Sequence, residues 1–222
     1  MFGKVYKYFI DILRSNDQVT AWLWGIRVHQ KCIPFSWDVT TIDLKRAFDE
    51  LLPEGSFCFL DMGCGHLCLL GQYVKIHRPD AQVLSVDVYP EFVQNAQFNA
   101  KKNRLLVDVR QSDLFERVSE KFDLIAFNPP YKSKTGQNKL KYEAIAYSGA
   151  DGTLVLRQFL KEAHDHLTMK GVVFLGVNCF FITEKLCLEI IAANNYVVEA
   201  TVRRFLNTAR VFILSSKRTS GN

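Results

Sequence analysis

The residues from 56 to 215 alternate between short apolar runs and longer segments with helical spacing, and this alternation constrains the fold more than any other feature. Strands that alternate with helices indicate right-handed crossover units and a parallel sheet. The predicted strands are 57–61, 82–87, 105–111, 123–128, 171–178, 196–203 and 209–215. Only a short connection joins the last two, so they are expected to pair in the antiparallel sense.

Segments with helical spacing fill the intervals between these strands. The predicted helices are 66–77, 90–102, 152–167 and 183–194. Pro90 opens the second of them, as proline does at a first helical position. A further helix, capped by Thr40 or Thr41, is expected to run to about Leu52. The chain is therefore expected to be an α/β protein: a Rossmann-like, seven-stranded, mostly parallel sheet with helices on both faces and a C-terminal antiparallel hairpin.

The start of the chain is expected to form a short helical extension. Residues 2–14 carry apolar side chains on one helical face, and 19–26 form a second short apolar piece. No Gly/Ser/Pro-rich linker divides the remaining sequence. We therefore expect residues 1–38 to form an N-terminal extension, able to act as a lid, on a single domain at 39–222.

The amino-acid composition constrains the class of protein less strongly than the pattern of strands and helices does. The six cysteines are scattered without a Cys-x-x-Cys pair and the five histidines show no metal spacing, which predicts free thiols, no bound metal and a reducing, cytoplasmic setting. The longest uncharged apolar stretch, 171–183, is shorter than the ~20 residues that a membrane helix needs, so no membrane partner is expected. The formal net charge of +5 indicates a nucleic-acid or acidic-protein partner only weakly.

Polar side chains end four of the predicted strands. Asp61, Asp87 and Asp113 stand at or just after the ends of the first three, and Asn128 ends the fourth. The carboxyl ends of parallel strands meet at one edge of the sheet, where ligands bind in open α/β folds. The sequence therefore predicts that these four side chains converge on one crevice.

The fourth strand ends abruptly at Pro129 and Pro130. Proline cannot donate to a strand ladder, so pairing must stop there. The residue before a proline is held in an extended geometry, which fixes Asn128. This strand tip is expected to present the Asn128 carboxamide and the Tyr131 ring rigidly.

The turn after the first strand has the sequence Asp61-Met62-Gly63-Cys64-Gly65. Glycines let a ligand approach the backbone closely at a helix N-terminus. Neither a dinucleotide fingerprint nor a Walker pattern is present, which argues against a pyrophosphate ligand. Asp87 is well placed to accept hydrogen bonds from ribose hydroxyls. A ligand with a ribose but no phosphate is S-adenosylmethionine.

Together these features resemble the class I S-adenosylmethionine-dependent methyltransferases, over roughly residues 34–215. The strand-end Asn-Pro-Pro-Tyr motif at 128–131 narrows the resemblance to the branch that methylates amide or amino nitrogens. This branch includes the HemK-type glutamine methyltransferases, ribosomal-RNA guanine methyltransferases, and tRNA or DNA adenine methyltransferases. Residues 147–153, with Arg157, are similar to a segment of the glutamine group, although Ala150 replaces a glycine. Residues 34–40 are similar to another, although Trp37 and Asp38 replace its acidic pair.

The resemblance implies a role for each candidate residue. The acceptor side would be catalytic and consist of Asn128, Pro129, Pro130 and Tyr131. The cofactor side would consist of Asp61, Gly63, Cys64 and Gly65 at the methionine part, Asp87 and Val88 at the ribose, Asp113 and Leu114 at the adenine, and Asn128 and Thr40 as further contacts.

These residues suit methyl transfer to a nitrogen whose lone pair is delocalised. The Asn128 oxygen and the Pro129 carbonyl can each accept a hydrogen bond from one of the two N–H groups of the target. This directs the nitrogen lone pair toward the methyl group. Tyr131 can stack on a planar target. Three acceptors remain open: a protein glutamine amide, which we expect first, a nucleobase amine of RNA or DNA, and a small molecule held under the N-terminal segment.

Overall fold

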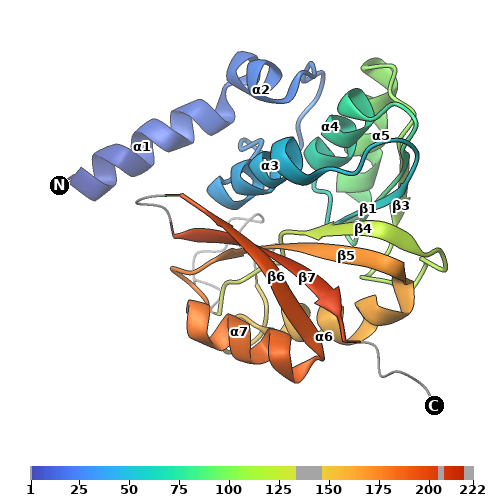
Figure 1. Cartoon of the computed structure of the whole chain (residues 1–222). Coiled ribbons are helices and arrows are strands. Elements are labelled where there is room, and N and C mark those ends of the chain that lie inside the picture. The colour runs from blue at the N-terminus through green and yellow to red at the C-terminus, as the bar shows by residue number, and fades with distance from the viewer. Residues whose placement is uncertain (1, 134–146, 205–207, 218–222) are drawn as a thin grey trace.

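The computed structural model describes residues 2–133, 147–204 and 208–217, which contain one seven-stranded sheet of order β3-β2-β1-β4-β5-β7-β6 (Figure 1). Its strands are β1 (Cys58–Met62), β2 (Gln82–Asp87), β3 (Asp108–Gln111), β4 (Phe122–Phe127), β5 (Leu167–Asn178), β6 (Tyr196–Arg203) and β7 (Ala209–Ser216). The first five are mutually parallel, whereas β7 lies between β5 and β6 and is antiparallel to both. The predicted Rossmann-like sheet and its antiparallel hairpin are confirmed.

Helices cover both faces of the sheet. One face carries α3 (Val39–Leu51), α4 (Leu69–His77) and α5 (Pro90–Lys102), and the other carries α6 (Leu154–Ala163) and α7 (Glu184–Ala193) (Figure 1). Each face has its own apolar core, with Phe48 of α3 against Phe59 and Phe174 on one side and Phe159 of α6 against Phe127 on the other. The central strands are therefore buried on both faces, as their continuous apolar runs predict.

Two helices, α1 (Phe2–Ser15) and α2 (Asp17–Trp24), precede α3 and the sheet in the chain. The Asn16 side chain caps α2 by accepting from the backbone N–H groups of Gln18 and Val19. Trp24 at the end of α2 is fully buried and packs edge-on against Tyr73 of α4, with ring centroids 5.9 Å apart. No helix among the described residues is both long and apolar enough to cross a membrane.

The chain between α2 and α3 is held by a ladder of asparagines on α5. Asn103 accepts from the backbone N–H of Arg27 at 3.0 Å, and Asn99 accepts from that of His29 at 2.8 Å. Asn95, one turn earlier, donates to the carbonyl of Gln30 at 3.0 Å. Residues at every fourth position share one face of a helix. The amides thus replace the backbone partners that an irregular segment lacks.

The structure differs from the sequence expectation at the start of α3. Its N-cap is Asp38, whose carboxylate accepts from the Thr41 N–H at 2.8 Å, and not Thr40 or Thr41. An aspartate at this position also complements the positive end of the helix dipole. Thr40 already lies inside the helix and is fully buried.

The third strand begins at Asp108, three residues later than predicted, because α5 ends in a longer turn. The Leu105 N–H donates to the Ala100 carbonyl and the Arg104 N–H to the Lys101 carbonyl, both at 3.0 Å. Arg104 adopts a left-handed conformation with φ of 59°. This is the Schellman motif, which satisfies the last carbonyls of a helix and consumes the residues after it.

Candidate active site

A cavity of about 390 Å³ opens at the carboxyl edge of the sheet. The cofactor-side predictions that line it are Gly63, Gly65, Asp87, Val88, Asp113 and Leu114. All four acceptor-side predictions, Asn128, Pro129, Pro130 and Tyr131, line it as well. Among the described residues that line it, three are acidic and none is basic. The cavity is therefore electrostatically suited to a cationic ligand and unsuited to a phosphate.

The glycine turn after β1 forms one wall. Gly63 has a φ of +63°, and a β-carbon on it would lie 3.2 Å from the Phe127 ring. The Gly65 N–H donates to Asp87 Oδ2 at 2.9 Å, which ties this turn to the end of β2. The positive φ of Gly63 and its tight contact with Phe127 both favour glycine, and the absence of a side chain there lets a ligand approach the backbone closely.

Asp87 is almost buried and its two oxygens face two backbone donors. Oδ2 accepts from Gly65, and Oδ1 accepts from the Tyr89 N–H at 3.0 Å. Burial raises the pKa of this carboxyl, and the backbone hydrogen bonds oppose that rise. Each oxygen keeps a further lone pair, so the carboxylate can also accept from ligand hydroxyls.

The turn after β3 places Leu114 in a strained conformation. Its φ is 43°, although it is a buried branched residue that lines the cavity. Ser112 supports the turn because its hydroxyl donates to the Leu114 carbonyl at 2.8 Å and accepts from the Arg117 N–H at 3.0 Å. Strain of this kind persists where a site needs a side chain at a fixed place. Asp113 beside it is exposed.

Asn128 follows β4, and its hydrogen bonds to described side chains all come from Nδ2. Its Nδ2 donates toward both carboxylate oxygens of Asp38, at 3.2 and 3.3 Å, and toward Thr41 Oγ1 at 3.3 Å. Its Oδ1 is buried and has no hydrogen-bond partner among the described residues. A buried, unsatisfied acceptor costs free energy unless a ligand pairs with it.

Tyr131 lies between the same carboxylate and an aromatic ring. Its hydroxyl donates to Asp38 Oδ2 at 2.9 Å, and its ring stacks on Phe181 with centroids 4.8 Å apart. Burial, and then the nearby Asp38 charge, raises the pKa of Tyr131 well above its usual range. The hydroxyl therefore remains a donor at neutral pH, and the ring is held at the cavity wall.

Three predicted cofactor contacts do not line the cavity: Asp61, Cys64 and Thr40. Asp61 is buried beneath the glycine turn, where it accepts from the Gly71 N–H at 3.0 Å, and burial raises its pKa to about 7. Cys64 donates its backbone N–H to the Val86 carbonyl at 2.9 Å, and Thr40 packs toward Gly176 of β5. Asp61 shapes the turn from behind it.

The segment 147–153 packs against the acceptor motif. The Ser148 N–H donates to the Lys132 carbonyl at 2.9 Å, just after the motif. Asp151 accepts from the backbone N–H and the hydroxyl of Thr153, and the Arg157 guanidinium donates to that hydroxyl at 3.0 Å. The similarity noted in the sequence thus corresponds to one hydrogen-bonded unit behind the motif.

Sequence reasoning missed Asp38, Thr41 and Phe181 as parts of the site. An N-cap preference could have pointed to Asp38, because an aspartate directly precedes a predicted helix there. Nothing local indicates that its carboxylate faces Asn128, which is 90 residues away. Phe181 stands in a loop after β5, and its stacking on Tyr131 has no sequence signal.

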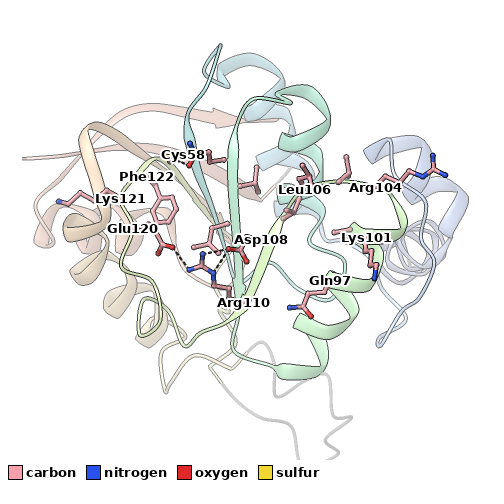
Figure 2. A pocket seen from close by; sticks show the side chains of 16 residues that line it. Cys58, Gln97, Lys101, Arg104, Leu106, Asp108, Arg110, Glu120, Lys121 and Phe122 are labelled. Atoms are coloured by element: carbon pink, nitrogen blue, oxygen red, sulfur yellow. Dashed lines mark hydrogen bonds and ion pairs between the residues drawn. The ribbon is translucent and has the colours of Figure 1, made fainter.

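A second hollow, of about 840 Å³, lies at the opposite end of β1, β2 and β3 (Figure 2). It forms where the connection from β3 to β4 carries no helix. Arg110 in its wall pairs with Asp108 at 2.5 Å and with Glu120 at 2.7 Å (Figure 2). None of the residues predicted for catalysis or cofactor binding lines this hollow. The candidate active site is therefore the cavity beside Asn128.

Comparison with known proteins agrees with this geometry. Residues 35–205 match the family described as the methyltransferase small domain. The chain belongs to this family. The release factor glutamine methyltransferase of Streptococcus pneumoniae is 32% identical over 131 residues, which are 56% of this chain and 47% of that protein. The ribosomal RNA small subunit methyltransferase C of Actinobacillus succinogenes is 33% identical over 121 residues, which are 54% of this chain and 32% of that protein.

The chain spans about half the length, or less, of these curated relatives of the methyltransferase small domain family. A methyltransferase from Pyrococcus furiosus has the same fold, with a TM-score of 0.70 at 21% identity over 95% of this chain and 98% of that one. S-adenosylmethionine is the cofactor that the family and its structural neighbours indicate. The residues fit it, because the described residues that line the cavity include three carboxylates, which suit a sulfonium and an ammonium group.

Proposed function

We propose that this chain is an S-adenosylmethionine-dependent N-methyltransferase whose acceptor is a planar nitrogen, namely the side-chain amide of a protein glutamine. One observation carries the proposal. The Asn128 Oδ1 is a buried acceptor without a partner among the described residues, and Asn128 lines the cavity together with Tyr131. An amide or amino N–H of an acceptor would satisfy it.

The proposed chemistry needs the chain mainly to align and polarise the nitrogen. Bound S-adenosylmethionine would supply an electrophilic methyl group. Asn128 Oδ1 and the Pro129 carbonyl would each accept a hydrogen bond from one of the two N–H groups of the target. These hydrogen bonds would stabilise the positive charge that develops on nitrogen. The bond between the target nitrogen and the methyl carbon would form as the sulfur–carbon bond breaks, and one nitrogen proton would then be released to water. Holding the reactants in line would lower the barrier further.

Glutamine is favoured over other amides by two features. The relative from Streptococcus pneumoniae is named a release factor glutamine methyltransferase. The segment 147–153, similar to that of the glutamine group, is bonded directly to the chain after Tyr131 through Ser148 and Lys132. A nucleobase amine is the second candidate, supported by the relative that is named a ribosomal RNA methyltransferase and by the exposed Phe180 beside the stacked Tyr131–Phe181 pair.

The test is transfer of labelled methyl from S-adenosylmethionine to separated protein, RNA, DNA and metabolite fractions. Wild-type protein should label the protein fraction, with the label recovered as N5-methylglutamine after enzymatic digestion and as methylamine after acid hydrolysis. Asn128→Ala should lower the rate by about 10²–10³, the usual effect of losing one hydrogen bond that stabilises a transition state. Label in RNA would select the second candidate, and equal rates for both proteins would reject the mechanism.

A further inference from the structure

We infer that Asp38 is a positioning residue that fixes which end of the Asn128 amide faces the cavity, an inference that rests on the proposed function. A carboxamide presents a donor at one end and an acceptor at the other, and the two ends have nearly the same shape. Rotation by half a turn would replace the acceptor at the cavity by a donor. A donor there would oppose the target N–H, so the orientation of this amide decides whether the site can work.

The groups behind Asn128 accept only one orientation. The Asp38 carboxylate has no proton to donate, and it lies 3.2 and 3.3 Å from Asn128 Nδ2. The Thr41 hydroxyl uses its proton on Asp38 Oδ1 at 2.8 Å, so it too can only accept from Asn128. A rotated amide would place its oxygen against three oxygen acceptors. Like partial charges in a partly buried site make that arrangement costly.

Asp38 is itself fixed by the fold. It caps α3 by accepting from the Thr41 N–H at 2.8 Å, where the helix dipole favours a negative charge. Its Oδ2 also accepts from the Tyr131 hydroxyl at 2.9 Å. One carboxylate therefore orients both the amide and the ring of the acceptor motif, from a segment 90 residues earlier in the chain.

Two substitutions separate this role from helix capping. Asparagine and serine are both good N-caps, so Asp38→Asn and Asp38→Ser should leave α3 intact. Asp38→Asn keeps a capping oxygen and brings an NH₂ group toward Asn128, which favours the rotated amide. Asp38→Ser removes the orienting carboxylate altogether. Asn16→Ser, the same kind of change at the N-cap of α2, is the matched control.

The first measurement reads the amide itself. In the ¹H–¹⁵N NMR spectrum of ¹⁵N-labelled protein, the signals of the Asn128 side-chain NH₂ pair are assigned by their loss in Asn128→Ser. In wild type this pair should be shifted downfield and protected from exchange, because it donates to a carboxylate. Asp38→Asn and Asp38→Ser should lose both signatures, whereas Asn16→Ser should keep them. An unchanged Asn128 signal in both Asp38 variants would overturn the inference.

The second measurement is the rate of methyl transfer into the fraction that wild type labels. At saturating S-adenosylmethionine, where a weaker Kd for the cofactor no longer limits the rate, both Asp38 variants should be slower by at least about tenfold. Thr41→Val, which removes one of the acceptors, should slow transfer less. Asp38 variants as fast as wild type would reject the positioning role and leave the proposed function standing. A wild type that labels nothing would reject the proposed function, and the amide spectrum would still decide the inference.

Discussion

Gly152 approaches Tyr131 so closely that a β-carbon on it would lie 2.4 Å from the Tyr131 carbonyl oxygen. Gly152 has a φ of +76° and belongs to the segment that is hydrogen-bonded behind the acceptor motif. Only a residue without a side chain fits between this segment and the motif backbone. The position of the Tyr131 ring thus depends on a glycine 21 residues later in the chain.

Gly152→Ala should therefore reduce both stability and activity. A left-handed alanine costs about 1–2 kcal/mol in free energy of unfolding, and the clash with buried backbone adds about 1–3 kcal/mol. Gly55→Ala is the matched control, because Gly55 has a φ of +74° and open space around it. Urea melts should show the smaller loss for the control, and methyl transfer should fall only in Gly152→Ala. Equal losses in the two variants would show that the contact with Tyr131 does not matter.

Arg104→Gly should stabilise the protein by about 1 kcal/mol, because a left-handed residue after a helix favours glycine. Arg104 has a φ of 59°, is exposed and has no ion-pair partner among the described residues. Arg104→Ala provides the comparison, since alanine keeps the backbone cost of arginine. Thermal unfolding of the three proteins checks the order. A gain of similar size in the alanine variant would attribute the effect to the side chain and not to the backbone.

The two parts of Tyr131 should have separable effects. Tyr131→Phe removes the hydroxyl that donates to Asp38 but keeps the ring on Phe181, so methyl transfer should fall by about tenfold or less, the effect of one ordinary hydrogen bond. Tyr131→Ala also removes the ring, so the rate of methyl transfer should fall much further. Initial rates at saturating S-adenosylmethionine measure both. A phenylalanine variant as slow as the alanine variant would assign the whole role to the hydroxyl.

The contribution of Asp61 to the free energy of unfolding should fall as the pH rises from about 4 to about 7. Its pKa is raised from 3.8 to about 7 by burial, so in this range the folded protein holds a proton that the unfolded chain releases. The stabilisation is complete below the unfolded pKa and is lost as the pH rises through the folded pKa. The slope for one such group is at most about 1.4 kcal/mol per pH unit.

Asp61→Asn isolates this contribution, because asparagine resembles the protonated acid and does not titrate. The stability of wild type relative to Asp61→Asn should decrease from pH 4 to pH 7 and become constant at higher pH. Urea melts of both proteins at intervals of half a pH unit provide the comparison. Parallel curves across the range would mean that Asp61 is ionised in the folded protein.

Much of the fold follows from local sequence, because each strand here is an apolar run and each helix has its own period. The first and last residues of the helices and strands were harder to predict. Asp108 begins β3 late because the Schellman motif at Arg104 uses the residues before it. α6 ends at Ala163, so β5 begins at Leu167 and not at 171. Turn geometry of this kind depends on conformations that ordinary residues adopt rarely, so composition gives little sign of it.

The candidate site, like the fold, could be predicted from the sequence only in part. The strand tips, Asp87 and Asn128, could be placed from sequence because parallel strands share a carboxyl edge. Asp38 could not, because its carboxylate reaches Asn128 across 90 residues of chain. Asp61 shows the limit of pattern reasoning, since its place at a strand end is correct but its side chain turns inward to Gly71.

The antiparallel strand in the interior of the sheet has a consequence for synthesis. β6 leaves the ribosome before β7, the only described strand with which it pairs, and β5 keeps an open edge until β7 inserts beside it. Unpaired apolar edges attract other chains, so the nascent protein is exposed to aggregation over this interval. The sheet closes when its last eight residues, Ala209–Ser216, are in place. Translation that stops before Ala209 therefore leaves β5 and β6 apart, however complete the cavity beside Asn128 already is.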